Sequence, residues 1–186
     1  MILAQLKRKE NIAEYLLYMW QIEDLIRAYN LDIDLIDKNI ISKYNVEDTQ
    51  RQEIKEWYES LIKMMELENK KQNGHLQINK NVIIRLADLH NELLKSPKFP
   101  EYGAEFYKAL PYIVELRAKS GENKVGELET CFNALYGILM LKLQGKELSE
   151  DTTKAITQIS KFVATLSTFY HKNEVRPIFD EDENNI

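Results

Sequence analysis

The stretch that decides the fold is residues 125–144, which read VGELETCFNALYGILMLKLQ. Its apolar residues recur at steps of three and four, the spacing that places side chains on one face of an α-helix. Two such stripes run along different sides of the helix: Val125, Leu128, Phe132, Leu135 and Leu139 form one, and Cys131, Ala134, Ile138 and Leu141 form the other. Because a helix that is apolar on more than one side needs several neighbours, the stretch predicts a central helix in a bundle.

The same helical period continues on both sides of this stretch. Further apolar stripes begin near Ile12, Ile33, Ile54 and Ile78, and the third of these is broken at Asn73-Gly74. A last stripe follows Ser149, which is a favourable residue for the start of a helix. No segment shows the sustained alternation of a β-strand. The sequence predicts an all-α fold, a single-domain bundle of about six to seven helices with its central apolar helix near 125–144.

Length and composition agree with one domain. The chain has 186 residues, 44% of them apolar, with six glycines and four prolines. A chain of this size can bury a sizeable core, and it has too little glycine and proline for a linker protein. We expect one helical domain at residues 1–172. Residues 173–186, which include the run DEDENN at 180–185, are expected to form an acidic, disordered tail.

Charge and hydropathy exclude several partners. The formal net charge is -5, from 25 Lys and Arg against 30 Asp and Glu, so no basic field exists to attract a phosphate backbone, and nucleic acid is not expected as a partner. The uncharged stretch from Thr130 to Leu141 is much shorter than the ~20 residues that span a bilayer, and we expect no membrane span. A single cysteine and the lack of an export signal favour a cytoplasmic location.

A proline interrupts the tyrosine-rich helical pattern between Phe99 and Gly121. Pro111 lacks the amide that would donate to the carbonyl of Tyr107, and its ring crowds that turn. We therefore predict a kink or the start of a new helix at Pro111. Tyr107 and Tyr112 flank this break and are candidate binding residues in a small pocket. The alternative is that their rings pack in the core while their hydroxyls reach solvent.

A second candidate binding cluster lies in the first strongly apolar helix. Gln21, Asp24 and Arg27, together with Glu23, follow directly on a run that is apolar on every side. Asp24 and Arg27 are spaced for an i,i+3 ion pair. If the bundle covers this region, these polar groups need partners. They either line a binding site or satisfy one another.

The residues that usually hold metals or attack substrates are poorly placed. The three histidines, His75, His90 and His171, belong to no Glu-x-x-His or His-x-x-x-His motif. No glycine-rich phosphate loop is present. Cys131 lies among apolar residues, which favours an inert core thiol over a nucleophile. The sequence predicts no metal site and no cofactor.

One motif points to an enzyme. Residues 85–90, RLADLH, place Arg85 and His90 with four residues between them. This resembles the Arg-x4–6-His motif of the HEPN family, all-helical nucleases in which such a pair is thought to act on the RNA backbone across a dimer interface. An arginine can stabilise charge at phosphorus while a histidine moves a proton. Leu86 departs from that pattern, and five steps along a helix rotate by roughly 140°. We predict that Arg85 and His90 do not converge within one protomer.

Three segments spread along the chain carry a family resemblance. They are KENIAEYLLYMWQ at residues 9–21, KALPYIVELRAK at 108–119 and ETCFNALYG at 129–137. Together they resemble a bacterial family, typical of the Bacteroidetes, that is described only as a domain of unknown function (4924). The resemblance implies a soluble, single-domain helical protein of bacterial origin. It brings no activity, cofactor or catalytic residue.

Two hypotheses of function follow from these residues. The first is a non-catalytic cytoplasmic helical-bundle protein that binds a protein partner or associates with itself. The alternative is a metal-independent HEPN-like ribonuclease that uses Arg85 and His90. The absence of any strong catalytic motif favours the first hypothesis and leaves open whether the protein is an enzyme.

Overall fold

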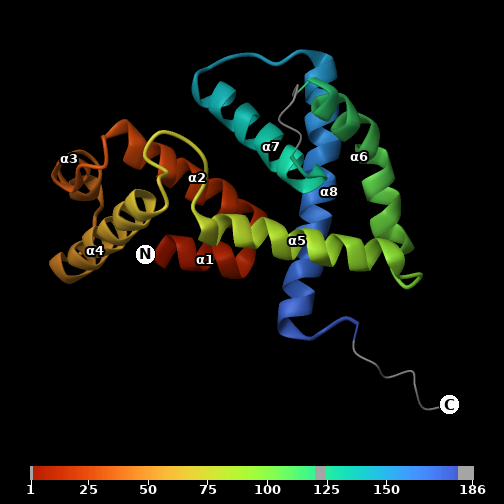
Figure 1. Cartoon of the computed structure of the whole chain (residues 1–186), viewed down its shortest axis with the longest axis horizontal. Coiled ribbons are helices and arrows are strands. Elements are labelled where there is room, and N and C mark those ends of the chain that lie inside the picture. The colour runs from red at the N-terminus through yellow and green to blue at the C-terminus, as the bar shows by residue number, and fades with distance from the viewer. Residues whose placement is uncertain (1, 120–124, 180–186) are drawn as a thin grey trace. The chain divides into compact units, whose positions relative to one another are not determined.

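The computed structural model describes residues 2–119 and 125–179, and it confirms the all-α fold class (Figure 1). Within these ranges the chain forms helices and no strand. In chain order the helices are α1 (Ile2–Glu10), α2 (Ile12–Ala28), α3 (Ile33–Asn39), a 3-10 helix η1 (Ile41–Lys43), α4 (Asp48–Leu67), α5 (Gln77–Lys95), α6 (Pro100–Lys119), α7 (Glu127–Leu143) and α8 (Glu150–Val175).

Contacts along the chain cluster in two compact units. The first unit comprises Met1–Arg8 and Glu14–Val82, and the second comprises Lys9–Ala13 and Ile83–Ile186. The first unit therefore holds most of α1 and α2, all of α3 and α4, and the beginning of α5. The second holds the rest of α5 and helices α6, α7 and α8.

The N-terminal helix α1 is one that the apolar pattern did not reveal. It is short and ends at a charged run, and Asn11 separates it from α2. The Asn11 side chain explains this division, because its Oδ1 accepts a hydrogen bond from the amide of Ala13 at 3.0 Å, as a helix N-cap does. The same Oδ1 accepts a second hydrogen bond from the hydroxyl of Ser167 in α8, at 2.8 Å.

Helix α4 ends before the Asn73-Gly74 break that the sequence indicated. Its last residue is Leu67, and Asn69 then adopts a left-handed backbone with φ 55°. The amide of Asn69 donates to the carbonyl of Glu66, and the amide of Lys70 donates to the carbonyl of Met65. This is the Schellman closure, which asparagine supports almost as well as glycine. The segment that follows is consequently a loop, and Gly74 lies inside it with φ 80°.

The second unit is built around α8. Helices α6 and α7 both pack along it, and they also contact each other (Figure 1). As predicted, Ser149 caps the start of α8, where its hydroxyl accepts from the amide of Thr152 at 3.2 Å. The buried residues of α8 recur at helical spacing: Ile159, Phe162, Val163, Leu166, Ser167, Phe169 and Tyr170. Helix α8 runs to Val175 and the described chain to Phe179, so the acidic run that begins at Asp180 lies outside the described residues.

Helix α7, the apolar helix near 125–144, is buried mainly in its first half. Leu128, Thr130, Cys131 and Phe132 are buried, whereas Leu135 and the residues around it are half-buried. Cys131 is completely buried, and this burial raises the pKa of its thiol to about 12. The thiol therefore stays protonated and enclosed, as expected of an inert core cysteine. Since Leu135 retains contact with solvent, its truncation costs less than that of a fully buried leucine.

Of the two outcomes predicted at Pro111, the start of a new helix is wrong, whereas the kink stays a prediction. Helix α6 continues through Pro111 from Pro100 to Lys119, and no new helix begins there. The predicted helix end at Gly121 lies outside the described residues. Pro111 is exposed, so its ring has room on the outer side of the helix. The helix therefore tolerates the loss of one backbone donor because its other face packs through Ala109 and Ile113, which are fully buried.

This arrangement predicts a stabilising substitution. Replacing Pro111 by Ala restores a donor for the carbonyl of Tyr107, and we expect the free energy of unfolding to rise by about 1–2 kcal/mol. The gain is smaller than the full helical penalty of proline because Pro111 also stiffens the unfolded chain. Pro97→Ala is the matched control, since Pro97 lies in a turn and its replacement only loosens the unfolded chain. Urea denaturation that shows Pro111→Ala to be no more stable than the parent contradicts this prediction.

Candidate functional site

Like Asn79 in α5, the carboxylate of Glu23 in α2 has no exposed surface. Its Oε1 accepts hydrogen bonds from the amide of Leu76 at 3.0 Å and from Nδ2 of Asn79 at 2.7 Å. Its Oε2 lies 2.6 Å from Nδ1 of His75. The carboxylate of Glu23 in α2 therefore accepts from two amide groups at the start of α5. The residues at this helix start supply no capping side chain of their own.

His75 is held on two sides. Its ring stacks on Trp20 with 3.9 Å between the ring centroids and 9° between the planes, while Nδ1 meets Glu23. The His75 side chain remains 22% exposed. The contact with the carboxylate through Nδ1 orients the imidazole ring. Within the described ranges, no group of three or more His, Cys, Asp or Glu side chains is placed to hold a metal ion.

Arg27, one turn after Glu23, forms hydrogen bonds with the loop between α4 and α5. Its guanidinium donates to the carbonyls of Lys70 and Gly74, and it pairs with Asp24 at 2.6 Å. The i,i+3 pair predicted from the sequence is therefore present. The Gln21 amide instead donates to the carbonyl of Leu17 in its own helix. The structure brings Asp24 and Arg27 together at the loop and leaves Gln21 apart from them.

Arg85 and His90 do not share a site within the chain. Arg85 is exposed and forms no hydrogen bond or ion pair with a described residue. His90 is only 5% exposed, and its Nδ1 lies 2.6 Å from the hydroxyl of Tyr102. The rings of Phe106 and Phe162 flank the imidazole edge-on. Burial lowers the pKa of His90 to about 4, so the imidazole is neutral and enclosed at pH 7.

The two tyrosines near Pro111 also separate. Tyr107 is 65% exposed and lines none of the three cavities described below. Tyr112 lines a polar cavity of about 460 Å³ between the end of α6 and the start of α8, beside Glu115 and Ser149. Tyr112 is thus one lining residue of a cavity and Tyr107 is not, and the binding role predicted for the two tyrosines stays a prediction.

An apolar groove lies in the first unit between α1 and the chain around the start of α4. It has a volume of about 350 Å³ and is lined by Leu3, Leu6, Tyr44, Val46, Gln50, Glu53 and Ile54. Leu3 and Leu6 are 41% and 47% exposed, although both are large apolar residues. The sequence analysis missed this groove because it did not predict α1.

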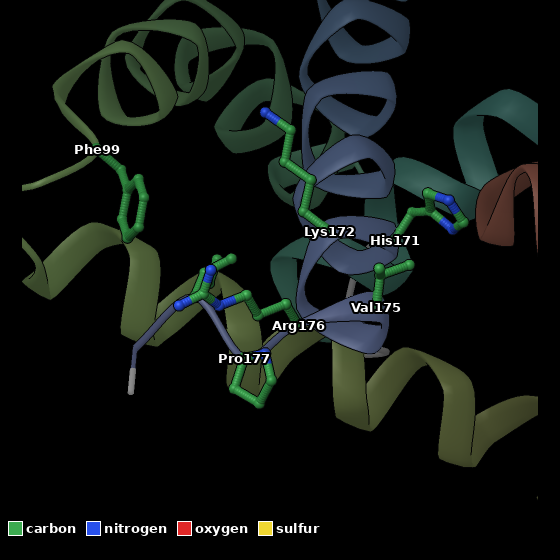
Figure 2. Close-up of a pocket in the computed structure, with 7 residues that line it drawn as sticks. Phe99, His171, Lys172, Val175, Arg176 and Pro177 are labelled. Atoms are coloured by element: carbon green, nitrogen blue, oxygen red, sulfur yellow. The ribbon is translucent and has the colours of Figure 1, made fainter. Parts of the chain in front are cut away.

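A further pocket, of about 660 Å³, lies in the second unit at the C-terminal end of α8. Its lining residues are Phe99, His171, Lys172, Val175, Arg176, Pro177 and Ile178. Figure 2 shows the side chains of Lys172 and Arg176 extending towards the side where Phe99 lies, whereas His171 extends to the other side of the helix. Among the described residues that line it, none carries a carboxylate.

These features define a class: an all-α protein with a buried carboxylate that organises its first unit and with several open surface pockets. The chain belongs to the family described as "Domain of unknown function (DUF4924)", whose model matches residues 1–176. No curated protein and no solved structure matches the chain. Among the described helices, none combines the length and the apolar character that crossing a bilayer requires.

Proposed function

We propose that the protein is a non-catalytic cytoplasmic protein that associates with a second copy of itself through the apolar groove of its first unit. The observation that carries this proposal is the exposure of Leu3 and Leu6 beside that groove. Apolar side chains of this size on a helix face usually have a protein surface to pack against. The enclosed position of His90 supports a binding function over the ribonuclease alternative, because a buried imidazole cannot reach an RNA phosphate.

A second copy fits the groove because one surface carries both the apolar face of α1 and the groove against which that face can pack. In a two-fold dimer, each copy lays Leu3 and Leu6 of α1 against the groove of the other, so that one patch serves both partners. The charges around the groove are also complementary. Helix α1 carries Arg8 and also Lys7, which pairs with Glu14 of the same chain at 3.1 Å, whereas the opposite wall carries Glu53. A two-fold axis between the copies sets opposite charges against each other, which favours this partner over an unrelated apolar one.

The proposal predicts that Leu6→Asp weakens self-association at least tenfold. Burying one leucine side chain contributes about 1.5–3 kcal/mol, and a charge in its place must also be desolvated. Sedimentation velocity of the full chain, from about 1 to about 500 µM, measures the effect. Leu67→Asp is the matched control, because Leu67 is 75% exposed in the same unit and lies outside the groove.

The expected result is a monomer–dimer equilibrium for the parent and for Leu67→Asp, with Leu6→Asp shifted to the monomer. A parent chain that remains monomeric over the whole range overturns the proposal. The same holds if both variants shift the equilibrium equally, because the effect then belongs to added charge and not to the groove.

A further inference from the structure

Helix α6 carries a row of apolar side chains on the side that faces away from its buried residues. The buried residues of this helix are Tyr102, Phe106, Ala109 and Ile113. On the other side, apolar residues recur at alternating steps of three and four: Ala104, Tyr107, Pro111, Val114 and Ala118. All of them are exposed, Tyr107 by 65% and Val114 by 55%. A continuous row of exposed apolar residues usually marks a contact surface, and we call this row the α6 seam.

The spacing of the α6 seam indicates what kind of surface fits it. Alternating steps of three and four are the spacing of coiled-coil contacts, in which side chains of one helix insert between those of another. The row is narrow and follows the helix axis from Ala104 to Ala118, so a second α-helix can contact all of it. The spacing therefore favours another helix as the occupant.

Charged residues follow one edge of the seam. Glu101, Lys108 and Glu115 stand seven residues apart, alternate in sign and are all exposed. Within the helix, Lys108 pairs with Glu105 and Glu115 pairs with Lys119, each at 2.6 Å. Exposed pairs of this kind contribute little, so both charges remain available to a partner. A helix that packs along this edge needs a negative charge beside Lys108 and a positive charge beside Glu115.

We propose that the α6 seam pairs with the α6 seam of a second copy of the chain, with the two helices antiparallel. In the proposed register, Tyr107 lies against Ala118 of the second copy, and Pro111 lies against Val114 of the second copy. The two-fold axis repeats both contacts with the roles exchanged. The large ring of Tyr107 thus fills the space beside a small alanine, as close packing between facing helices requires.

The charges distinguish this register from others. Lys108 lies beside Glu115 of the second copy, and the two-fold axis makes the same pair a second time. If one helix slides by seven residues, Lys108 instead meets Lys108 of the second copy and Glu101 meets Glu115, so that like charges face each other. In a parallel pair, Lys108 lies beside Gly103 of the second copy and gains no opposite charge. The apolar row and the charges therefore favour the same antiparallel register.

The α6 seam lies in the second unit, whereas the groove of the proposed self-association lies in the first. The seam therefore goes beyond the proposed function and does not rest on it. Ala104, Pro111 and Ala118 contribute little apolar area, so the seam is the weaker of the two contacts. We expect it to associate the chains only at millimolar concentration, above the range in which the groove acts. Chains that use both contacts then assemble beyond the dimer.

The test uses the full chain with Leu6→Asp, which disables the groove so that the seam is measured alone. Sedimentation equilibrium at low salt, from about 0.1 to about 3 mM, measures dimer formation. We expect Lys108→Glu to weaken this dimer about tenfold, because two ion pairs become two like-charged contacts at once. Glu115→Lys should weaken it equally. The double variant Lys108→Glu, Glu115→Lys should restore the affinity of the Leu6→Asp chain, because both pairs are only reversed.

Lys161→Glu is the matched control, because Lys161 is exposed on α8 of the same unit and lies outside the seam. Val114→Asp places a charge within the seam and should abolish association. A Leu6→Asp chain that stays monomeric up to about 3 mM overturns the proposal. So does a dimer that Lys108→Glu weakens no more than Lys161→Glu does, or that the double variant fails to restore. Failure of the groove is recognised separately, since Leu6→Asp then associates as strongly as the parent between about 1 and about 500 µM.

Discussion

Replacing Glu23 by Ala is expected to lower the free energy of unfolding by about 3–5 kcal/mol. The substitution removes the acceptor for three groups at once: the amide of Leu76, Nδ2 of Asn79 and Nδ1 of His75. Each buried donor that is left without a partner costs about 1–3 kcal/mol. A loss of this size is a large share of the stability of an ordinary domain.

Glu66→Ala is the matched control for this prediction. Its carboxylate pairs with Lys71 at 2.9 Å in the same unit, but its side chain is 48% exposed, and such pairs contribute at most about 1 kcal/mol. Urea denaturation followed by far-ultraviolet circular dichroism compares the two. Glu23→Gln should fall between them, because it keeps the volume and one acceptor oxygen. If Glu23→Ala and Glu66→Ala unfold at the same urea concentration, the buried carboxylate does not organise the first unit.

Acidification should destabilise the protein through His90. Burial lowers the pKa of His90 to about 4 in the folded chain, whereas the unfolded value is about 6.5. The nearest carboxylate oxygen, on Glu127, lies 3.9 Å from Nε2 and belongs to a residue whose side chain is 37% exposed, so burial is the stronger influence. Above about pH 6.5 the full contribution of neutral His90 is present. Below about pH 6.5, His90 binds a proton in the unfolded chain but not in the folded chain. The free energy of unfolding therefore falls until about pH 4.

The difference between the two pKa values corresponds to about 3 kcal/mol. His90→Gln should therefore flatten the pH dependence of the unfolding free energy between pH 6.5 and 4 by about this amount, relative to the parent. The glutamine side chain can still hydrogen-bond the Tyr102 hydroxyl. His171→Gln is the control, because His171 is exposed and lies outside the aromatic surroundings of His90. Parallel stability curves for His90→Gln and the parent would show that His90 charges in the folded state.

The apolar period predicted the helices well, because burial of one face imposes the spacing of three and four on the sequence. It failed at α1, which is short and whose last turn is charged, so its stripe contains too few residues to stand out. It also misplaced the end of α4, since the left-handed turn there is made by Asn69 and not by the glycine that the sequence offered. The new helix predicted as one alternative at Pro111 is absent, because packing of Ala109 and Ile113 outweighs the local penalty of proline.

The candidate site was predictable only where its partners are close in sequence. The Asp24–Arg27 pair spans three residues and was expected, whereas the contact between Glu23 and His75 spans 52 residues and leaves no periodic trace. His90 was expected to lie apart from Arg85, and its burial was not predicted. Its burial depends on Phe106 and Phe162, which reach it from two other helices. The burial of a residue by side chains of other helices cannot be derived from the spacing of residues within its own helix.

The hydrogen bond between Asn11 and Ser167 has a consequence for how the protein is made. These residues are 156 positions apart, yet the second partner of the cap at the start of α2 comes from α8. During synthesis, Asn11 leaves the ribosome long before Ser167 has been translated. The second partner of this cap is therefore missing until α8 has been synthesised, and the second unit closes only then. Until then, the nascent chain exposes apolar surface that α8 later covers, and chaperones have this interval in which to bind it.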